Sequence, residues 1–442
     1  FLFPQIYNFR YNIFSSEWPV ANRVIELYLQ KKSENGGWER QINGISNNEK
    51  AVLLLEKRTF KELLVDMELR NLQNNIVGQE ASRLFARAEI NMGVEAFRDS
   101  LYSLLKRNTF LNIKFENMLD TLGEISRTDI RSLLGEWEKT TPLPFYSLGE
   151  PTLTKITNKG GEEFFVLKML ISNNSDYDGI IHMDIRKDGW WYQPLEDPRA
   201  KTKIEMPAHT SKEFVSVWED QIRNVEINTM VSGNLPNIIS QDINNVKQER
   251  NKIVKDSIYI LPESSFDLPG EIIVDNEDST LFILSAPPIV GLLPKWLDEV
   301  EETPFKYSGI SWWRPPLQWT ATTNDRYYGK YIRSAFVIKS GDGSQTATWK
   351  VPVPEVGQYD LYYHVFKDDE LRWNNNLQGE YHFKVKYGSE VEDAYVNLRK
   401  ANEGWEQLGS YYFDSDTIRV VLTDECKLRS VTADAVKIVK RY

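Results

Sequence analysis

The 442-residue chain contains one cysteine, Cys426, and only four histidines. A single thiol forms no internal disulfide and supplies no thiolate cluster for zinc. No two histidines are separated by helical spacing, so the His-Glu-x-x-His zinc helix is absent. A Ser-His-Asp order, a Gly-rich phosphate loop and a Cys-His pair are missing as well. We therefore expect no cofactor and no assembled catalytic motif in this chain.

Excess positive charge and long apolar runs are also lacking. Lys and Arg number 53 against 64 Asp and Glu, which leaves a net charge of −11. Nucleic acids and anionic membrane surfaces need a basic face, so neither is an expected partner. No apolar run approaches the length of a transmembrane helix. The first ten residues, FLFPQIYNFR, contain neither an initiator Met nor a signal peptide, which indicates a processed product or a fragment.

Aromatic residues are abundant, at 12% of the chain with 13 Trp and 21 Tyr. Their rings fill protein cores, but they also stack on sugars. The densest stretch is 311–328, SWWRPPLQWTATTNDRYY, in which three tryptophans and two tyrosines surround a Pro-Pro pair. This stretch is the first place to look for a binding surface.

The spacing of apolar residues divides the chain into parts, as its length requires. Residues 1–145 show the capping signals and apolar spacing typical of helices. The period then becomes two, which predicts a small immunoglobulin-like β-sandwich over 146–240. The charged, Asn-rich segment 241–267 is the expected linker. Residues 268–442 predict a second all-β domain, a jelly roll or β-sandwich, with a Pro- and Trp-rich excursion at 287–316. In that domain we expect strands at 333–339, 346–351, 358–365, 381–387, 392–398, 409–413, 417–422 and 433–439.

Several short motifs recur in order along the last part of the chain. They are Ile273-Val-Asp-Asn-Glu-Asp278, Trp319, Tyr327-Tyr-Gly329, Ala347-Thr-Trp-Lys-Val-Pro352, Gly357-Gln-Tyr-Asp-Leu-Tyr362, Gly404-Trp-Glu-Gln-Leu-Gly409 and Ala433-Asp-Ala-Val436. With these motifs, residues 268–442 resemble the golvesin C-terminal-like domain, also described as a xanthan-lyase-associated carbohydrate-binding-like domain. Such domains are typically appended to secreted bacterial proteins. The resemblance implies an extracytoplasmic location, in the periplasm or at the cell surface, and a polysaccharide or an envelope protein as partner.

A second, looser resemblance covers residues from about 70 to 240. The motifs are Ala81-Ser-Arg-Leu-Phe85, Gly93-Val-Glu-Ala-Phe97 and Gly135-Glu-Trp137. Their order is similar to the C-terminal portion of aminopeptidase N-type zinc metallopeptidases. The family's zinc helix is absent, and no tyrosine lies between Tyr28 and Tyr102, where its transition-state tyrosine belongs. The resemblance therefore implies the tail of a metallopeptidase-like chain, active or degenerate, and the chain as given is not expected to be an enzyme.

Two groups of residues are candidates for binding carbohydrate or a protein partner. Trp312, Trp313 and Arg314 lie in the excursion, and a polar tip carries Asp368, Asp369, Arg372 and Trp373. Flat aromatic faces suit the apolar C–H faces of pyranose rings, and charged side chains suit their hydroxyls. The alternative is that the tryptophans pack between domains. Trp319 and Tyr327-Tyr-Gly329 belong to the domain's own signature, so we expect them to be structural.

Two further groups of residues have side chains of the types found in functional sites. Asp275-Asn-Glu-Asp278 offers the hard oxygens that calcium prefers, but four consecutive positions cannot all face one ion, which favours a turn-capping cluster. Tyr363 and His364 are residue types that a polysaccharide lyase uses. Alternation along a strand places them on opposite faces, which argues against a lyase site.

The sequence thus predicts a helical region followed by two all-β sandwich domains. Its predicted function is the non-catalytic binding portion of a secreted or envelope-associated bacterial protein. One alternative is a structural or scaffolding subunit of a cell-envelope assembly. Another is the tail of an active peptidase or polysaccharide lyase.

Overall fold

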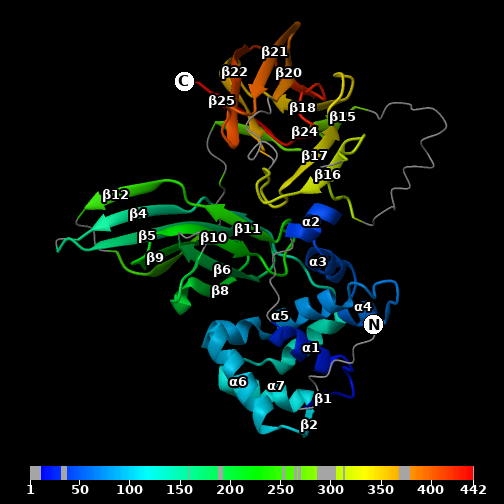
Figure 1. Cartoon of the computed structure of the whole chain (residues 1–442), viewed down its shortest axis with the longest axis vertical. Helices are drawn as coiled ribbons and strands as arrows, with labels where there is room; N and C mark the ends of the chain where they lie inside the picture. Colours follow the sequence, from blue (N-terminus) through cyan, green and yellow to red (C-terminus); the bar gives the residue numbers. More distant parts are fainter. Residues whose placement is uncertain are drawn as a thin grey trace. The chain divides into compact units, whose positions relative to one another are not determined.

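The computed structural model describes residues 11–30, 37–158, 160–187, 193–250, 254–262, 266, 270–285, 305–311, 314–367 and 379–441 (Figure 1). The chain forms two compact units. Unit 1 comprises Phe1–Asn35 and Asn47–Ser265, and unit 2 comprises Gly36–Ser46 and Phe266–Tyr442. Each unit is described by itself.

The first part of unit 1 is helical, as the sequence predicted. Its elements are β1 (Asn12–Phe14), α1 (Ala21–Leu29), α3 (Asn47–Lys57), α4 (Phe60–Val65), α5 (Gln73–Met92), α6 (Val94–Arg107), β2 (Asn112–Lys114), α7 (Phe115–Ser126) and a 3-10 helix (Arg131–Glu138). Helix α5 contacts α1, α3, α4, α6 and α7, so it is the central element of the bundle. The core is strongly aromatic: Trp18, Phe60 and Trp137 pack together with ring centroids 4.9–6.4 Å apart.

Helix α4 begins at a capping box. The hydroxyl of Thr59 accepts a hydrogen bond from the Glu62 amide at 3.2 Å, and the Glu62 carboxylate accepts one from the Thr59 amide at 2.9 Å. Two amides that the helix leaves without an internal partner are satisfied in this way. The cap fixes where the chain turns from α3 into α4, and so places Phe60 in the core.

The second part of unit 1 consists of two packed sheets. One has the strand order β12-β4-β5-β9-β13, with β3 also paired to β5; the other has the order β11-β10-β6-β7, with β8 also paired to β6. The strands are β3 (Tyr146–Leu148), β4 (Thr152–Thr157), β5 (Glu163–Asn173), β6 (Gly179–Lys187), β7 (Gln193–Pro194), β8 (Lys201–Met206), β9 (Thr210–Trp218), β10 (Ile222–Asn228), β11 (Ile238–Asp242), β12 (Val246–Arg250) and β13 (Ser257–Pro262). Alternate residues of β5 and β6 meet between the sheets, among them Leu167, Met169, Ile181 and Met183.

The expected linker at 241–267 is wrong over most of its length. Strand β12 pairs with β4 in parallel, and β13 pairs with β9 in antiparallel fashion, so both are edge strands of the first sandwich. Four of the five residues of β12 are exposed, and the strand carries charged side chains at Lys247, Glu249 and Arg250. An edge strand with no buried face shows no apolar alternation, which is why its sequence is typical of a linker.

The helices and the first sandwich belong to the same unit. Helix α5 packs on β8, where the buried Glu89 accepts a hydrogen bond from the Tyr28 hydroxyl at 2.9 Å and pairs with Lys203. A second link is the Asn237 amide, which donates to the Glu49 carboxylate at 2.9 Å. These contacts join the two parts through buried charged and polar groups.

Unit 2 is a β-structure of three sheets. Their orders are β14-β25-β19-β22, β15-β18-β23-β20-β21 and β16-β17-β24. The elements are α2 (Gly37–Asn43), β14 (Glu271–Val274), β15 (Phe282–Leu284), β16 (Thr320–Thr323), β17 (Ser334–Lys339), β18 (Thr346–Pro352), β19 (Gly357–Val365), β20 (Glu380–Tyr387), β21 (Glu390–Asn397), β22 (Gly404–Phe413), β23 (Thr417–Thr423), β24 (Ser430–Ala433) and β25 (Val436–Lys440). Its core contains Trp349, Tyr359, Tyr363, Phe383 and Phe413, all at most 1% exposed.

The coarse fold prediction, a helical amino-terminal region followed by mostly β-sheet structure, is confirmed. The finer topologies, immunoglobulin-like for the first sandwich and jelly roll for the second, stay predictions. Most of the excursion at 287–316 lies outside the described residues.

A short segment from the first part of the chain completes unit 2. The carbonyl of Gly44 accepts a hydrogen bond from the Thr323 hydroxyl at 2.6 Å. A Cβ on Gly309 would lie 1.9 Å from the carbonyl oxygen of Ile42, so only glycine fits there. Residues 37–46 therefore pack closely on residues far from them in sequence.

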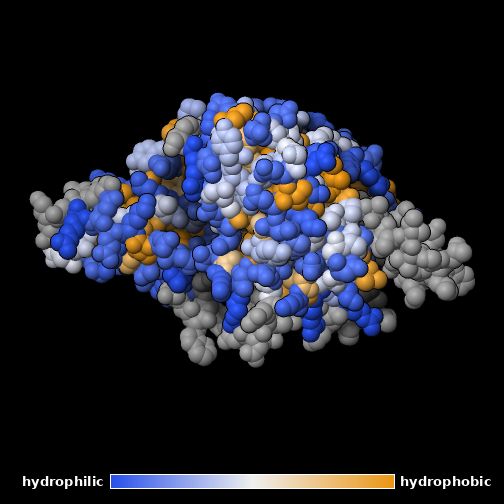
Figure 2. Space-filling model, turned by 90° about the horizontal axis from the view of Figure 1, so that it is seen from above, coloured by the Kyte–Doolittle hydropathy of each residue, from blue (hydrophilic) through white to orange (hydrophobic). Residues whose placement is uncertain are grey.

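Among the described residues, no helix is both long and apolar enough to cross a membrane. The face of the molecule in Figure 2 is mainly hydrophilic, with small separate hydrophobic patches.

Candidate functional site

Most of the sequence-predicted site residues cannot be placed. Trp312, Trp313, Asp368, Asp369, Arg372 and Trp373 lie outside the described residues. Arg314 is described: its side chain is exposed, and its amide donates to the Ser311 carbonyl at 3.1 Å. Trp319 is partly buried against the core of unit 2, so its expected structural role is confirmed.

Strand β19 sends its side chains alternately into the core and outward. Tyr363 is fully buried and its hydroxyl donates to the Thr432 carbonyl at 2.5 Å, whereas His364 remains partly exposed on the other face. The predicted separation of these two residues is confirmed. They cannot act together as a lyase base and its partner.

The outward face of this sheet carries a group that we call the aromatic cluster: Tyr328, Tyr362, His364, Trp405 and Lys437. The ring centroid of Trp405 lies 5.0 Å from that of Tyr328 and 5.2 Å from that of His364. The Lys437 ammonium lies 4.8 Å from the Trp405 ring centroid and 5.4 Å from that of Tyr362. All five are partly exposed, so the cluster is a surface and not a part of the core.

Strand register brings the cluster together. His364 of β19 is the direct partner of Trp405 in β22, and Tyr362 is the partner of Lys437 in β25. Directly opposed residues of an antiparallel pair project on the same face, which accounts for both pairs. Three strands far apart in sequence thus contribute four of the five side chains.

Tyr328 reaches the cluster from a tight loop. A Cβ on the next residue, Gly329, would lie 1.9 Å from the carbonyl oxygen of Ile332, so the loop closes only around glycine. Of the Tyr-Tyr pair, Tyr327 is buried at 6% exposure, as a structural role requires, and Tyr328 is not. The expected structural role is therefore confirmed for Tyr327 and stays a prediction for Tyr328.

A buried carboxylate supports the cluster from beneath. Asp434 is fully buried, accepts the Tyr328 amide at 3.1–3.2 Å, and lies 2.8 Å from Nδ1 of His364. Burial raises the pKa of Asp434, and the neighbouring His364 opposes that rise. Burial and the charge of Asp434 together hold the pKa of Asp275 well above its usual range.

The acidic run around Asp275 caps a turn. The Asp275 carboxylate accepts the Asn276 amide at 2.7 Å, and that of Asp278 accepts the Asp275 amide at 2.9 Å. Glu277 pairs with Lys306 at 2.6 Å instead. The turn-capping interpretation is thus confirmed. In the described part of the chain, no group of three or more His, Cys, Asp or Glu residues is placed to hold a metal ion.

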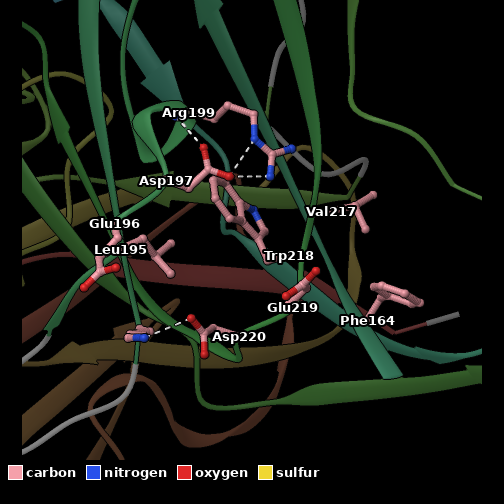
Figure 3. Close-up of a pocket in the computed structure, with 10 residues that line it drawn as sticks. Phe164, Leu195, Glu196, Asp197, Arg199, Val217, Trp218, Glu219 and Asp220 are labelled. Atoms are coloured by element: carbon pink, nitrogen blue, oxygen red, sulfur yellow. Dashed lines mark hydrogen bonds and ion pairs between the residues drawn. The ribbon is translucent and has the colours of Figure 1, made fainter. Parts of the chain in front are cut away.

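Unit 1 has a pocket of its own at one end of the first sandwich (Figure 3). It encloses about 590 Å³ and is lined by Phe164, Lys187, Leu195, Glu196, Asp197, Arg199, Val217, Trp218, Glu219 and Asp220. Figure 3 shows Arg199 facing Asp197 above the Trp218 indole. The guanidinium carbon lies 4.9 Å from the Trp218 ring centroid, and the Asp197 carboxylate accepts two of its N–H groups at 2.6–2.9 Å.

Both cations of this pocket are already paired, since Lys187 contacts Asp220 at 2.9 Å. The Arg199 guanidinium covers the Trp218 ring, which opposes stacking of a sugar on that indole. The pocket therefore supports a ligand role less well than the aromatic cluster.

Sequence reasoning missed Tyr362, Trp405 and Lys437. The available signal was the alternation of β19, which placed Tyr362 and His364 outward, together with the tryptophan of the Gly404–Gly409 motif. What the sequence did not give was the register of β22 and β25 against β19, because those strands lie 40–80 residues downstream.

No curated protein matches the chain. Among solved structures, a β-glucuronidase of Bacteroides uniformis aligns at 10% identity and a TM-score of 0.20, over 68% of this chain and 30% of that one. TmCBM61, solved with β-1,4-galactotriose, aligns at 14% identity and a TM-score of 0.15, over 39% of this chain and 86% of that one. These similarities are too low to establish a common fold.

The family model of the golvesin C-terminal domain matches residues 315–440. The match covers β16 to β25 and includes all five residues of the aromatic cluster. None of the comparisons supports the resemblance to aminopeptidase N-type peptidases. Residues 315–440 of this chain are a golvesin C-terminal domain, as the sequence motifs predicted.

Proposed function

We propose that the chain is a non-catalytic binding portion of a bacterial envelope or secreted protein, and that its golvesin domain binds carbohydrate through the aromatic cluster. The observation that carries this proposal is the meeting of Trp405, Tyr328 and Tyr362 with polar His364 and Lys437 on one partly exposed sheet face. Pyranose rings present apolar C–H faces to such rings and hydroxyls to the polar groups around them. An extracytoplasmic location, in the periplasm or at the cell surface, belongs to the same proposal.

The test is a panel of neutral oligosaccharides, probed with the whole chain and with Trp405→Ala. Loss of one stacking ring weakens binding by about 1–2 kcal/mol, or roughly tenfold. Tyr412→Ala is the matched control, because Tyr412 lies on the same strand, is 60% exposed and is not part of the cluster. Equal binding by wild type and Trp405→Ala would rule out the cluster as the site.

The sequence-predicted residues remain a second proposed contact region. These are Trp312, Trp313 and Arg314, with Asp368, Asp369, Arg372 and Trp373. Trp312→Ala and Trp373→Ala belong in the same titrations. A loss confined to these variants, with Trp405→Ala unaffected, assigns binding to the loops instead of the sheet face.

One observation favours the alternative of a scaffold subunit. Strand β13 is an edge strand, and its Ile258, Tyr259, Ile260 and Leu261 are 40–72% exposed. Uncharged, apolar edge strands are surfaces for pairing with another chain. Co-purification of a fixed envelope protein with wild type, and its loss in Ile260→Lys but not in Tyr177→Lys, supports this role.

We also propose that residues 70–240 are the C-terminal portion of a metallopeptidase-like chain. Its support is the placement of the three motifs, on α5, at the start of α6 and in the 3-10 helix that carries the buried Trp137. Aminopeptidase assays on the native full-length protein test whether that chain is active or degenerate.

A further inference from the structure

We propose that His364 contacts the bound sugar directly and that Asp434 fixes the tautomer in which it does so. In this arrangement Nδ1 carries the imidazole proton and Nε2 accepts a hydrogen bond from a sugar hydroxyl. The inference rests on the proposed carbohydrate function, and it names the ligand class as a neutral pyranose.

The tautomer follows from the contacts of Asp434. Its Oδ2 atom lies 2.8 Å from Nδ1 of His364, and both its oxygens lie within 3.2 Å of the Tyr328 amide nitrogen. The Tyr328 amide can only donate, so the carboxylate is the acceptor in that contact. A carboxylate accepts from the imidazole in the same way, which places the ring proton on Nδ1. In a neutral imidazole the other nitrogen is then an acceptor.

Nε2 is available to a ligand. Within the described part of the chain, the only hydrogen bond of His364's ring is the one from Nδ1 to Asp434. The side chain keeps 13% of its surface exposed. Its ring centroid lies 5.7 Å from that of Tyr328 and 5.2 Å from that of Trp405, so the acceptor sits beside the stacking surface. A pyranose stacked on those rings directs its equatorial hydroxyls outward around its edge, toward such a group.

The surrounding charges favour a neutral sugar over a uronate. The groups that face His364 are Asp434 beneath it, Asp275 beyond Asp434, and Arg333, whose charge acts on Asp434. Lys437 lies on the neighbouring strand and is paired with Glu271 at 2.9 Å. A ligand carboxylate at Nε2 would meet an acceptor without a proton, above two acidic side chains.

Two substitutions distinguish a direct contact of His364 with the sugar from a purely structural role. In His364→Asn the amide nitrogen takes the place of Nδ1 and still donates to Asp434, but nothing replaces Nε2. In His364→Gln the longer amide reaches the Nε2 position with an acceptor oxygen and leaves Asp434 with the Tyr328 amide but without the imidazole donor. If His364 is only structural, His364→Asn should be the milder change. If His364 contacts the ligand, His364→Gln should be the milder change.

The probes are gluco-, galacto-, manno- and xylo-tetraose, with tetragalacturonate as the acidic counterpart, titrated calorimetrically into the full chain. We expect His364→Asn to bind the preferred neutral probe about three- to tenfold more weakly, as loss of one hydrogen bond implies. We expect His364→Gln to retain binding more closely. Wild-type affinity in His364→Asn, or preference for tetragalacturonate, overturns the inference and leaves the proposed function standing. Binding of none of the probes by wild type overturns the proposed function itself.

A second readout needs no ligand. Nitrogen-15 spectra of the histidine-labelled full chain distinguish the two tautomers, and the His364 signals are those missing in His364→Asn. A proton on Nδ1 at neutral pH is expected. A proton on Nε2 overturns the inference whatever the titrations show.

Discussion

The carboxylates of Asp434 and Asp275 in unit 2 show how single residues shape its surface. Asp434 lies under the aromatic cluster and holds both the Tyr328 amide and the His364 ring. Asp275 is close enough for the charge of Asp434 to raise its pKa, in addition to the rise caused by burial. Two acids in one buried region are unfavourable when both are ionised. The pair of carboxylates beneath the aromatic cluster therefore lowers the stability of unit 2 at neutral pH.

Asp275→Asn is expected to stabilise unit 2 at neutral pH. The folded-state pKa of Asp275 lies above its unfolded value, so its contribution is favourable at low pH and is lost as the pH rises through the folded pKa. Asparagine keeps an acceptor for the Asn276 amide and cannot ionise. At pH 7–8 we expect a gain of about 1 kcal/mol, or roughly 2–4 °C in melting temperature, and almost none near pH 4. Calorimetric melts across that range are the measurement, and a lowered midpoint at pH 8 would contradict it.

At the residue level, the sequence indicated aromatic and polar side chains as candidate binding residues, but it did not show which of them lie together on the sheet. It placed Tyr363 and His364 on opposite faces of one strand and expected Trp319 to be structural, and both expectations are confirmed. It favoured tryptophans crowded in one stretch over Trp405, which stands alone in its motif. Proximity along the chain is visible in a sequence, but proximity across three strands is not.

Between elements, the junction of α5 and β8 depends on one buried ion pair. Glu89 and Lys203 keep 3% and 11% of their side-chain surfaces exposed. Lys203→Met leaves the Glu89 charge buried with only the Tyr28 hydroxyl as partner, which costs about 3–5 kcal/mol in comparable cases. We expect unit 1 to unfold at correspondingly lower denaturant concentration.

The double variant is the informative control. Glu89→Gln retains an acceptor for Tyr28 and removes the charge, so Glu89→Gln with Lys203→Met should recover most of the loss. A double variant as unstable as the sum of both single variants would show that the pair is not coupled.

Strand β13 makes a different prediction, about association. Ile260 is 72% exposed on an edge strand, so Ile260→Lys should change the free energy of unfolding by less than about 0.5 kcal/mol. A charge on the edge opposes strand pairing between chains, so concentration-dependent self-association should fall. Light scattering over a range of concentrations measures this, with Tyr177→Lys, a loop position that is 48% exposed, as control. Unchanged association in Ile260→Lys would exclude β13 as the cause.

The elements that the sequence predicted best are those with one buried face. The strand expected at 346–351 is β18, Thr346–Pro352, and that expected at 358–365 is β19, Gly357–Val365. The failure at 241–267 involves the two edge strands β12 and β13, one polar after Val246 and the other apolar after Ser257. Neither alternates, because neither has a face fixed against a core.

For the whole molecule, the main surprise is the path of the chain. It runs from unit 1 into unit 2 at residues 36–46, returns to unit 1, and enters unit 2 again after 265. Composition and periodicity gave the succession of helical and β parts. They could not assign α2 to unit 2, because a seven-residue helix carries too little pattern to show what it packs against.

Gly309→Ala tests this assignment. The new methyl group would lie 1.9 Å from the Ile42 carbonyl oxygen, so α2 must shift or detach. Steric strain of this kind costs about 1–3 kcal/mol, and we expect the melting transition of unit 2 to fall by several degrees. Gly135→Ala is the control, because a Cβ there meets nothing within 4 Å. An unchanged transition in Gly309→Ala would mean that α2 contributes nothing to unit 2.

The double passage of the chain also determines what a protease can separate. A cut just after β13 breaks the last of the three connections between the units, but the amino-terminal fragment still contains residues 36–46, which are part of unit 2. The fragments then remain attached through α2 and its contacts without any peptide bond between them. Such a nicked protein runs as two bands under denaturing conditions and elutes as one species under native conditions. Unit 2 is released only when the chain is also cut on both sides of residues 36–46.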